Sequence, residues 1–325
     1  MMGFVKKNWF LFLITASAVL LLFLWIQGRS RERKEDLPDL PVISYPKLPG
    51  QSVLTSTQVT FVSTVLPTQM AVYKTSPRAM TPLQAKVLAK TFGFPEEPSN
   101  ISQDATFGDY YLWLSGSQSL SIRLSPLDIS LGQDPSLASP PTEGDLPSEQ
   151  TGIDFVKNVL TLNDLDVSGV DFAFEKTVSV FNDSLLEVSA DPTFDKIKIV
   201  DTNPKTPLVS AYLGKDGKIY GLIYRSGFTT PVMQVPYPLK NLEEIKNAFV
   251  VEGKMLSLGE ASETPLLLVP SQISIELIEL GLLYSPENPT ALLPVYTLDG
   301  KARTEAGEVP VYIYIPAVKS RYVKK

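Results

Sequence analysis

The sequence predicts an α+β protein in which an N-terminal transmembrane helix is followed by two modules, each made of a helix and an antiparallel sheet. First, the run from Trp9 to Ile26 contains no charged residue. Second, segments rich in β-branched and aromatic residues are joined by short turns and outnumber the helical patterns. Third, two proline-rich stretches separate the segments from one another. Few helices combined with many hairpins favour antiparallel sheets over a doubly wound parallel sheet.

Composition excludes several chemistries before any motif is considered. The 325 residues include no cysteine and no histidine, and the formal net charge is −6. Disulfides, thiolate nucleophiles, zinc sites made of Cys and His, and Ser-His-Asp triads are therefore excluded. An acidic chain lacks the basic surface that phosphate backbones require, so we expect no nucleic-acid partner.

Residues 1–7 are predicted to be a short N-terminal tail and residues 8–27 a transmembrane anchor. The apolar run spans about 27 Å as a helix, which matches the hydrocarbon core of a bilayer. Trp9 and Trp25 lie near its ends, where indole rings favour the interface. A cleaved signal peptide would end in a small-residue site, but Ala16-Ser17-Ala18 lies in the middle of the run. The lipid bilayer is therefore the first expected partner.

The orientation of the anchor is argued from two opposing signals. More Lys and Arg follow the run than precede it, which by itself places the C-terminal side in the cytoplasm. Long domains, however, translocate largely regardless of such charges. The absence of cysteine, the strand-rich pattern and a family resemblance described below favour the outside. We therefore expect a single-pass protein of the cell membrane with most of the chain extracytoplasmic.

Residues 28–52 are predicted to be a proline-rich tether, and residues 53–125 the first module. Within this module Thr81 is a helix N-cap, Pro82 suits the first helical turn and Gly93 ends the helix. The strands are expected at 59–65, 70–74, 110–114 and 120–124, the last two forming a hairpin.

Residues 126–147 are rich in proline and serine and predict a linker, and residues 148–325 are predicted to form the second module. A helix is expected at about 149–161, and another begins at Asn241 with Glu244 placed for a capping box. Asp-Gly turns are expected at 216–217 and 299–300. The strands are expected at 170–180, 185–189, 196–201, 208–213, 219–224, 273–284, 292–298 and 309–315. The two modules are either a diverged repeat or two unrelated units.

One stretch matches the spacing of a calcium-binding loop. Asp164, Asp166, Ser168 and Glu175 fall at positions 1, 3, 5 and 12, with Gly169 at position 6. Oxygen ligands at this spacing can surround a hard cation. The residues that follow alternate like a strand, whereas such a loop requires an exiting helix. The other interpretation is an ordinary turn in which Asp and Gly play local roles.

No catalytic residue and no cofactor site is predicted. The chain has no glycine-rich phosphate loop, and its S-x-x-K match, Ser44 to Lys47, lies in the tether. Acidic pairs could hydrolyse glycans, but the sequence singles out none of them. Aromatic residues on strands could form a ligand-binding face, or could simply fill half-buried sheets. These residues are Tyr110, Tyr111, Trp113, Tyr212, Tyr220, Tyr224, Tyr296, Tyr312 and Tyr314.

Four stretches in the second module carry a family resemblance. They are YPLKNLEEIKNAF (237–249), ISIELIELGLLY (273–284), LLPVYTLDG (292–300) and VYIYIPAV (311–318). They resemble single-pass bacterial proteins related to PepSY-type domains, in the neighbourhood of the extracytoplasmic regulators of the Gram-positive cell-wall histidine kinase. The resemblance implies an outside location and a regulatory role, and it transfers no catalytic residue.

The sequence thus predicts a non-enzymatic, membrane-anchored extracytoplasmic protein that binds or regulates another envelope component, with an envelope protein as the expected partner. Two alternatives stay open. One is a cell-envelope hydrolase that uses paired carboxylates. The other is a ligand-binding module with a tyrosine-rich sheet face.

Overall fold

The computed structural model describes residues 37–40, 58–104, 108–133, 143–167, 169–180, 184–201, 207–258, 270–285, 288–305 and 307–323. The predicted anchor, 8–27, with Trp9 and Trp25, lies outside these residues, as does most of the tether. In the described part of the chain no helix has the length and apolar character needed to cross a bilayer.

The prediction of an α+β fold built from two helix-plus-antiparallel-sheet modules is wrong, and the transmembrane helix that it included falls on residues outside the described part of the chain. The described residues are mostly strand, and their sixteen strands belong to one mixed sheet. Strands from the two predicted modules interleave in it: β2 (Gln69–Lys74) pairs with β12 (Val232–Pro238) and β15 (Ala291–Thr304). A period-2 pattern identifies a strand but does not identify its partner, because any free edge satisfies the same backbone groups.

Two local expectations in this sheet also change. The stretch expected to be a linker begins with β6 (Leu127–Gln133), which pairs with β5 (Gln118–Leu124) and β11 (Ile219–Tyr224). Asp299-Gly300, expected to be a turn, lies inside β15. The backbone of Ser274 approaches Gly300 so closely that no Cβ would fit there, so this glycine serves strand packing instead of a reversal.

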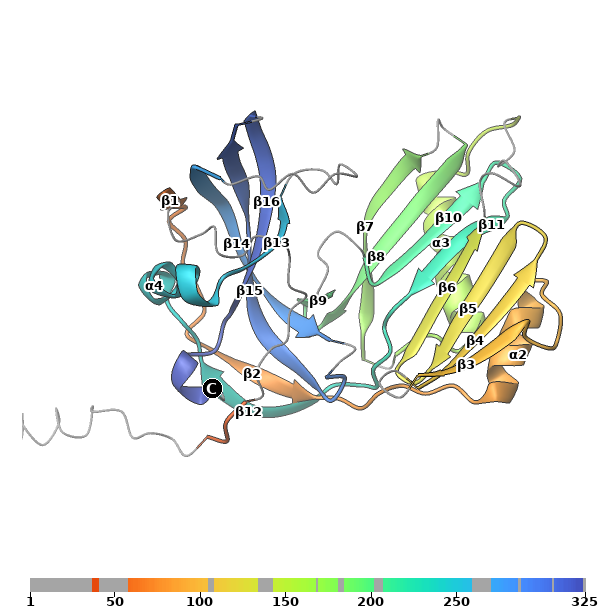
Figure 1. The fold of residues 1–325 in the computed structure, drawn as a ribbon, viewed down its shortest axis with the longest axis horizontal. Helices are drawn as coiled ribbons and strands as arrows, with labels where there is room; N and C mark the ends of the chain where they lie inside the picture. The colour runs from red at the N-terminus through yellow and green to blue at the C-terminus, as the bar shows by residue number, and fades with distance from the viewer. Residues whose placement is uncertain are drawn as a thin grey trace, which may run out of the picture.

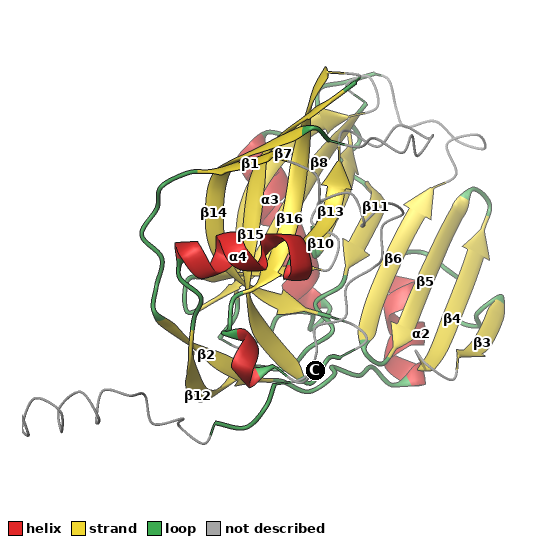
Figure 2. Cartoon of the chain, turned by 60° about the vertical axis from the view of Figure 1, so that its left-hand side comes forward, coloured by secondary structure: helices red, strands yellow, loops and turns green. Residues whose placement is uncertain are grey.

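The sheet is folded into two lobes (Figure 1). The helix-backed lobe carries two helices on one sheet face, as Figure 2 shows for α2. Its further elements are α2 (Pro82–Thr91), β3 (Asn100–Asp104), β4 (Gly108–Ser115), α3 (Glu149–Leu162), β7 (Asp171–Val180), β8 (Leu185–Phe194) and β10 (Val209–Gly214). The C-terminal lobe adds β1 (Gln58–Phe61), β9 (Ile197–Asp201), α4 (Leu242–Glu252), β13 (Lys254–Leu258), β14 (Gln272–Tyr284), β16 (Gly307–Pro316) and the 3-10 helix η2 (Ser320–Tyr322).

The helix starts follow the sequence signals. The Thr81 hydroxyl accepts from the Gln84 amide at 3.3 Å, while the Gln84 side chain accepts from the Thr81 amide at 2.9 Å. Asn241 and Glu244 form the same reciprocal pair at the start of α4, with both bonds at 2.9 Å. Each pair satisfies two backbone donors that a helix start leaves open, which confirms both predicted caps.

Each lobe has its own core. The core of the helix-backed lobe contains the fully buried Trp113 and Tyr224, and the core of the C-terminal lobe contains Tyr296 and Phe249. Strand β9 joins the two lobes. Its residue Ile197 pairs with Phe194 of β8, and its last three residues pair in parallel with β14. Side chains near β9 are therefore brought together from both lobes.

Candidate functional site

A group of partly buried ionisable side chains lies where β9 joins the lobes. We call it the junction cluster. It consists of Arg123, Asp128, Asp191, Lys198, Asp201, Arg225, Tyr284, Asp299 and Tyr314. These residues come from β5, β6, β8, β9, β14, β15, β16 and the segment after β11. Perturbed ionisable groups that gather in this way mark a candidate site, and they also occur in purely structural networks.

Ion pairs connect most of the cluster. Lys198 Nζ lies 2.8 Å from Asp191, and Arg225 lies 3.5 Å from Asp201, whose side chain is only 6% exposed. Arg123 and Asp128 face each other across β5 and β6 at 3.9 Å. Each of these three acids thus has a cation within 4 Å, which offsets the cost of removing a carboxylate from water.

Two carboxyl groups of the cluster have raised pKa values. Burial raises the pKa of Asp128, and the nearby Arg123 and Arg225 oppose this effect. Burial, reinforced by the charge of Glu279, raises the pKa of Asp299 to about 6. One carboxyl oxygen of Asp299 is buried without a hydrogen-bond partner. A neutral carboxylic acid tolerates this position better than a carboxylate does.

The buried tyrosines complete the cluster. The Tyr314 hydroxyl donates to the backbone carbonyl of Asp201 at 3.0 Å. Burial, followed by neighbouring carboxylates, raises the pKa of both Tyr284 and Tyr314. Among the described residues no group of three acidic side chains could hold a metal ion. The geometry is that of a network at the contact between two lobes, because three of its four acids face cations within 4 Å.

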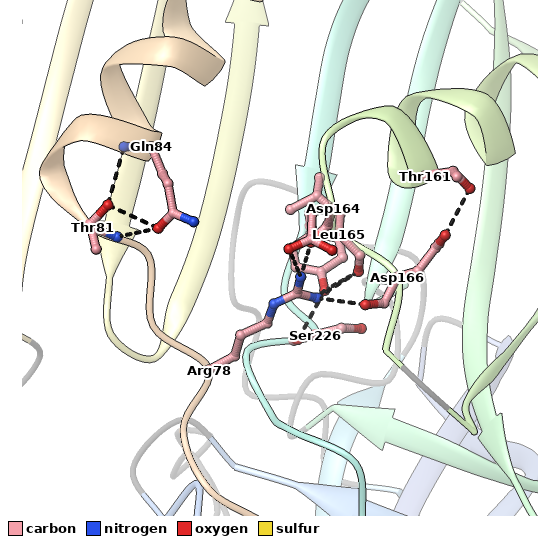
Figure 3. A network of polar contacts seen from close by, with 9 residues as sticks. Arg78, Thr81, Gln84, Thr161, Asp164, Leu165, Asp166 and Ser226 are labelled. Atoms are coloured by element: carbon pink, nitrogen blue, oxygen red, sulfur yellow. Dashed lines mark hydrogen bonds and ion pairs between the residues drawn. The ribbon is translucent and has the colours of Figure 1, made fainter.

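The predicted calcium loop is placed next to an arginine (Figure 3). Arg78, from the segment between β2 and α2, donates to the carbonyls of Leu165 at 2.8 Å and Asp166 at 3.1 Å, and also to the carbonyl of Asp164. Its guanidinium also contacts the Tyr224 hydroxyl at 3.1 Å. These carbonyls follow the C-terminus of α3, where a positive charge is favourable.

The other loop residues are engaged locally or lie outside the description. The Asp164 carboxylate is 3.9 Å from Arg78, and the Asp166 carboxylate accepts from the Thr161 hydroxyl at 2.7 Å. Ser168 and the side chain of Glu175 are not among the described residues. Strand β7 follows the loop where a calcium-binding loop would have a helix. A guanidinium therefore already supplies a positive charge beside this loop.

Replacing Arg78 by methionine is expected to destabilise the protein by about 2–3 kcal/mol, because the carbonyls lose charge-assisted hydrogen bonds. Water can partly replace the guanidinium at this surface, which limits the loss. Arg78→Lys is the matched control: a single ammonium cannot span three carbonyls, so about half of the loss is expected. Urea unfolding of both variants measures the effect. A loss below about 0.5 kcal/mol for Arg78→Met would contradict the network described here.

The aromatic residues considered for a ligand face do not form one exposed row. Five of them are buried, and four are half-buried. The buried rings are Tyr111, Trp113, Tyr224, Tyr296 and Tyr314, and the half-buried ones are Tyr110, Tyr212, Tyr220 and Tyr312. Tyr212 lies against Gly221 on the neighbouring strand. This ring covers a position that has no side chain of its own, which is a packing role.

Sequence reasoning missed a buried lysine. Lys240, only 3% exposed, donates from Nζ to the carbonyls of Pro316 and Val318, both at 2.7 Å. It also pairs with Glu252 at 2.9 Å. Residues 316–318 belong to the stretch VYIYIPAV (311–318), on which the family resemblance partly rests. A lysine beside an N-cap carries no local signal of burial, because its partners are more than seventy residues away in sequence or at the far end of α4.

The chain that leads from the predicted anchor enters the fold at residues 37–40. The amide of Leu40 donates to the carbonyl of Tyr322 at 2.7 Å, and Leu40 forms a parallel bridge with Val323. The Tyr237 hydroxyl donates to the carbonyl of Pro38 at 2.7 Å. This short segment is thus attached to β12 and to the C-terminal residues.

Comparison with known proteins adds no relative. No protein-family model matches the chain, and a search of curated proteins finds no significant match. The resemblance to PepSY-related proteins therefore stays a prediction based on the four stretches quoted above.

Proposed function

We propose that this chain is a membrane-tethered protein of the cell envelope that binds another envelope protein and catalyses no reaction itself. The apolar run from Trp9 to Ile26 and the basic residues after it support the tether. The observation that carries the proposal is the attachment of residues 37–40 to β12 and the C-terminal residues. It ties one particular side of the folded part to the anchor.

The short chain between the predicted anchor and residues 37–40 limits how far this side of the fold can lie from the bilayer. Eleven residue steps lead from Ile26 to Leu37, and fully extended they span at most about 40 Å. A compact body of about 290 residues is about 50 Å across. The side that holds residues 37–40 therefore stays close to the bilayer, and the opposite side projects away from it. A partner in the same membrane would meet the folded part in a restricted orientation, which lowers the entropic cost of binding.

The chemistry of the described residues is in keeping with a binding role. Cys and His are absent from the sequence, and three acids of the junction cluster face cations within 4 Å. A hydrolase that uses two carboxylates would need them on either side of an open cleft, one as acid and one as base or nucleophile. The junction cluster instead resembles a lobe-to-lobe contact.

Fractionation tests the tether. The full-length chain is expected to remain in the membrane fraction after alkaline carbonate washing, and protease added to spheroplasts is expected to digest its folded part. A chain with Ala16, Val19 and Leu20 changed to Arg is the control: near the centre of the run each charge makes insertion unfavourable by about 2.5–3.5 kcal/mol, so this protein should leave the membrane fraction. Recovery of the natural chain in the soluble fraction, or release of soluble glycan from purified cell wall by the chain, would contradict the proposal.

A further inference from the structure

The most exposed apolar strand of the described part is β12. Val232, Met233 and Val235 are 60%, 61% and 47% exposed, and Gln234 and Pro236 between and after them are also exposed. Strand β12 ends the strand order of the sheet, so beyond it no described strand follows. Soluble proteins usually protect such an edge with charges or a covering segment. Its apolar composition therefore calls for a partner that covers it.

The position of β12 indicates which partner that is. Its C-terminal half contacts both the tether segment and the C-terminal residues: the Tyr237 hydroxyl bonds to Pro38, and the rings of Tyr237 and Tyr322 lie 5.9 Å apart. In Figure 1 the strand runs along the same side as the C-terminus and the short segment of residues 37–40. With at most about 40 Å of chain between this side and the predicted anchor, β12 lies within reach of the membrane surface.

Cationic residues lie beside the start of the apolar stretch and close to the C-terminal end of β12. Exposed Lys74 is the register partner of Val232 on β2. At the other end the amide of Lys319 donates to the carbonyl of Pro238 at 3.1 Å, and Arg321 is exposed two residues later. Lys319 is paired with Glu244 at 3.2 Å. In a chain of net charge −6, an apolar stretch with exposed Lys74 beside it and exposed Arg321 on the neighbouring η2 matches the interface of a bilayer with anionic headgroups.

We propose that the β12 surface, defined as Val232, Met233 and Val235 with Lys74 beside Val232 and Arg321 in the neighbouring η2, docks on the headgroup region of a bilayer that contains anionic phospholipid. The apolar side chains enter the boundary between headgroups and acyl chains, and the cations face phosphate groups. This inference rests on the proposed tether, which supplies the high local concentration that a small apolar surface requires.

The natural absence of cysteine allows a direct test. Single variants Met233→Cys and Val235→Cys of the full-length chain are labelled with a polarity-sensitive fluorophore and placed in nanodiscs of phosphatidylcholine with or without phosphatidylglycerol. Leu162→Cys and Val87→Cys are matched controls, because these residues are 84% and 60% exposed in the helix-backed lobe. Leu21→Cys reports on the anchor itself. Quenching by nitroxide-labelled lipid is measured for every position.

We expect lipid quenching at positions 233 and 235 to exceed that at 87 and 162 at least threefold, and to rise with the phosphatidylglycerol content. Lys74→Glu together with Arg321→Glu should return it toward the control level. Quenching at 21 with control-level values at 233 and 235 would overturn the docking surface and leave the tether standing. No quenching at 21 would overturn both. Shielding of 233 from a soluble quencher without lipid quenching would assign the surface to a protein strand or a second copy, and would also overturn the inference.

Discussion

Raising the pH above about 10 is expected to unfold the protein cooperatively, before its buried tyrosines ionise. Burial raises the pKa of Tyr224 to about 12, and it raises the pKa of Tyr284, Tyr296 and Tyr314 as well. In the unfolded chain all of these groups ionise near pH 10. The stability that they contribute is therefore complete below pH 10 and is lost as the pH rises toward the folded-state pKa values.

The size of the effect follows from the shift. Two pKa units for Tyr224 correspond to about 2.7 kcal/mol, and several buried tyrosines together approach the whole stability of an ordinary domain. Tyrosinate absorbance and far-ultraviolet circular dichroism are measured on the same samples from about pH 8 to about pH 12.5, a range that brackets the unfolded-state and folded-state pKa values. We expect the absorbance of the buried fraction to rise only together with the loss of sheet signal.

A pair of phenylalanine variants provides the control. Tyr224→Phe removes one buried phenol and is expected to weaken the pH dependence above pH 10, although it also loses hydrogen bonds from the phenol to Leu165 and Ser226. Tyr110→Phe changes a half-buried ring and is expected to leave the alkaline midpoint within about 0.2 pH units. Ionisation of every tyrosine near pH 10 in a protein that keeps its sheet signal would show that these rings are not buried as described.

Replacing Lys240 by methionine is expected to cost about 3–5 kcal/mol, the largest loss among the single substitutions considered. The ammonium serves two carbonyls and the carboxylate of Glu252 inside the C-terminal lobe. Burial lowers the pKa of Lys240, and the pairing with Glu252 opposes this effect. Methionine fills the space of the lysine stem but leaves three acceptors without their donor. Urea unfolding midpoints measure the loss.

Two further variants separate burial from charge. Lys246→Met removes a lysine that pairs with Glu243 at 2.7 Å on the exposed face of α4, and a change within about 0.5 kcal/mol is expected. Adding Glu252→Gln to Lys240→Met removes the carboxylate charge that has lost its ammonium partner. The double variant is expected to regain about 1 kcal/mol or more of the free energy of unfolding. If Lys240→Met and Lys246→Met lowered the free energy of unfolding equally, the hydrogen bonds from Lys240 to residues 316 and 318 would not have the stabilising role described here.

The proposed membrane orientation and the docking of β12 connect these structural details to function. Lys240 holds the residues just before η2, and the carbonyl of Tyr322 in η2 accepts from the amide of Leu40. The hydrogen bonds of Lys240 therefore stabilise the C-terminal residues that contact residues 37–40, where the predicted tether joins the fold. Destabilised Lys240 variants are consequently unsuitable for testing the docking surface, and substitutions at exposed Lys74 and Arg321 serve that purpose instead.

Features that depend on a few neighbouring residues were determined by the sequence alone. The N-cap at Thr81, the Asn241–Glu244 capping box and the hairpin that turns at Asp216-Gly217 form as predicted, because each depends on residues within a few positions of each other. The absence of Cys and His likewise excluded whole classes of site without reference to any fold.

Only the tertiary structure decided which strands pair and which charges are buried. A strand exposes identical donors and acceptors along both edges, so nothing in Gln69–Lys74 specifies pairing with Val232–Pro238 in the other half of the chain. In the same way, Arg78 and Lys240 look like surface cations until distant carbonyls surround them. Removing these cations partly or fully from water is favourable only when those carbonyls are present, so their placement depends on the assembled tertiary structure.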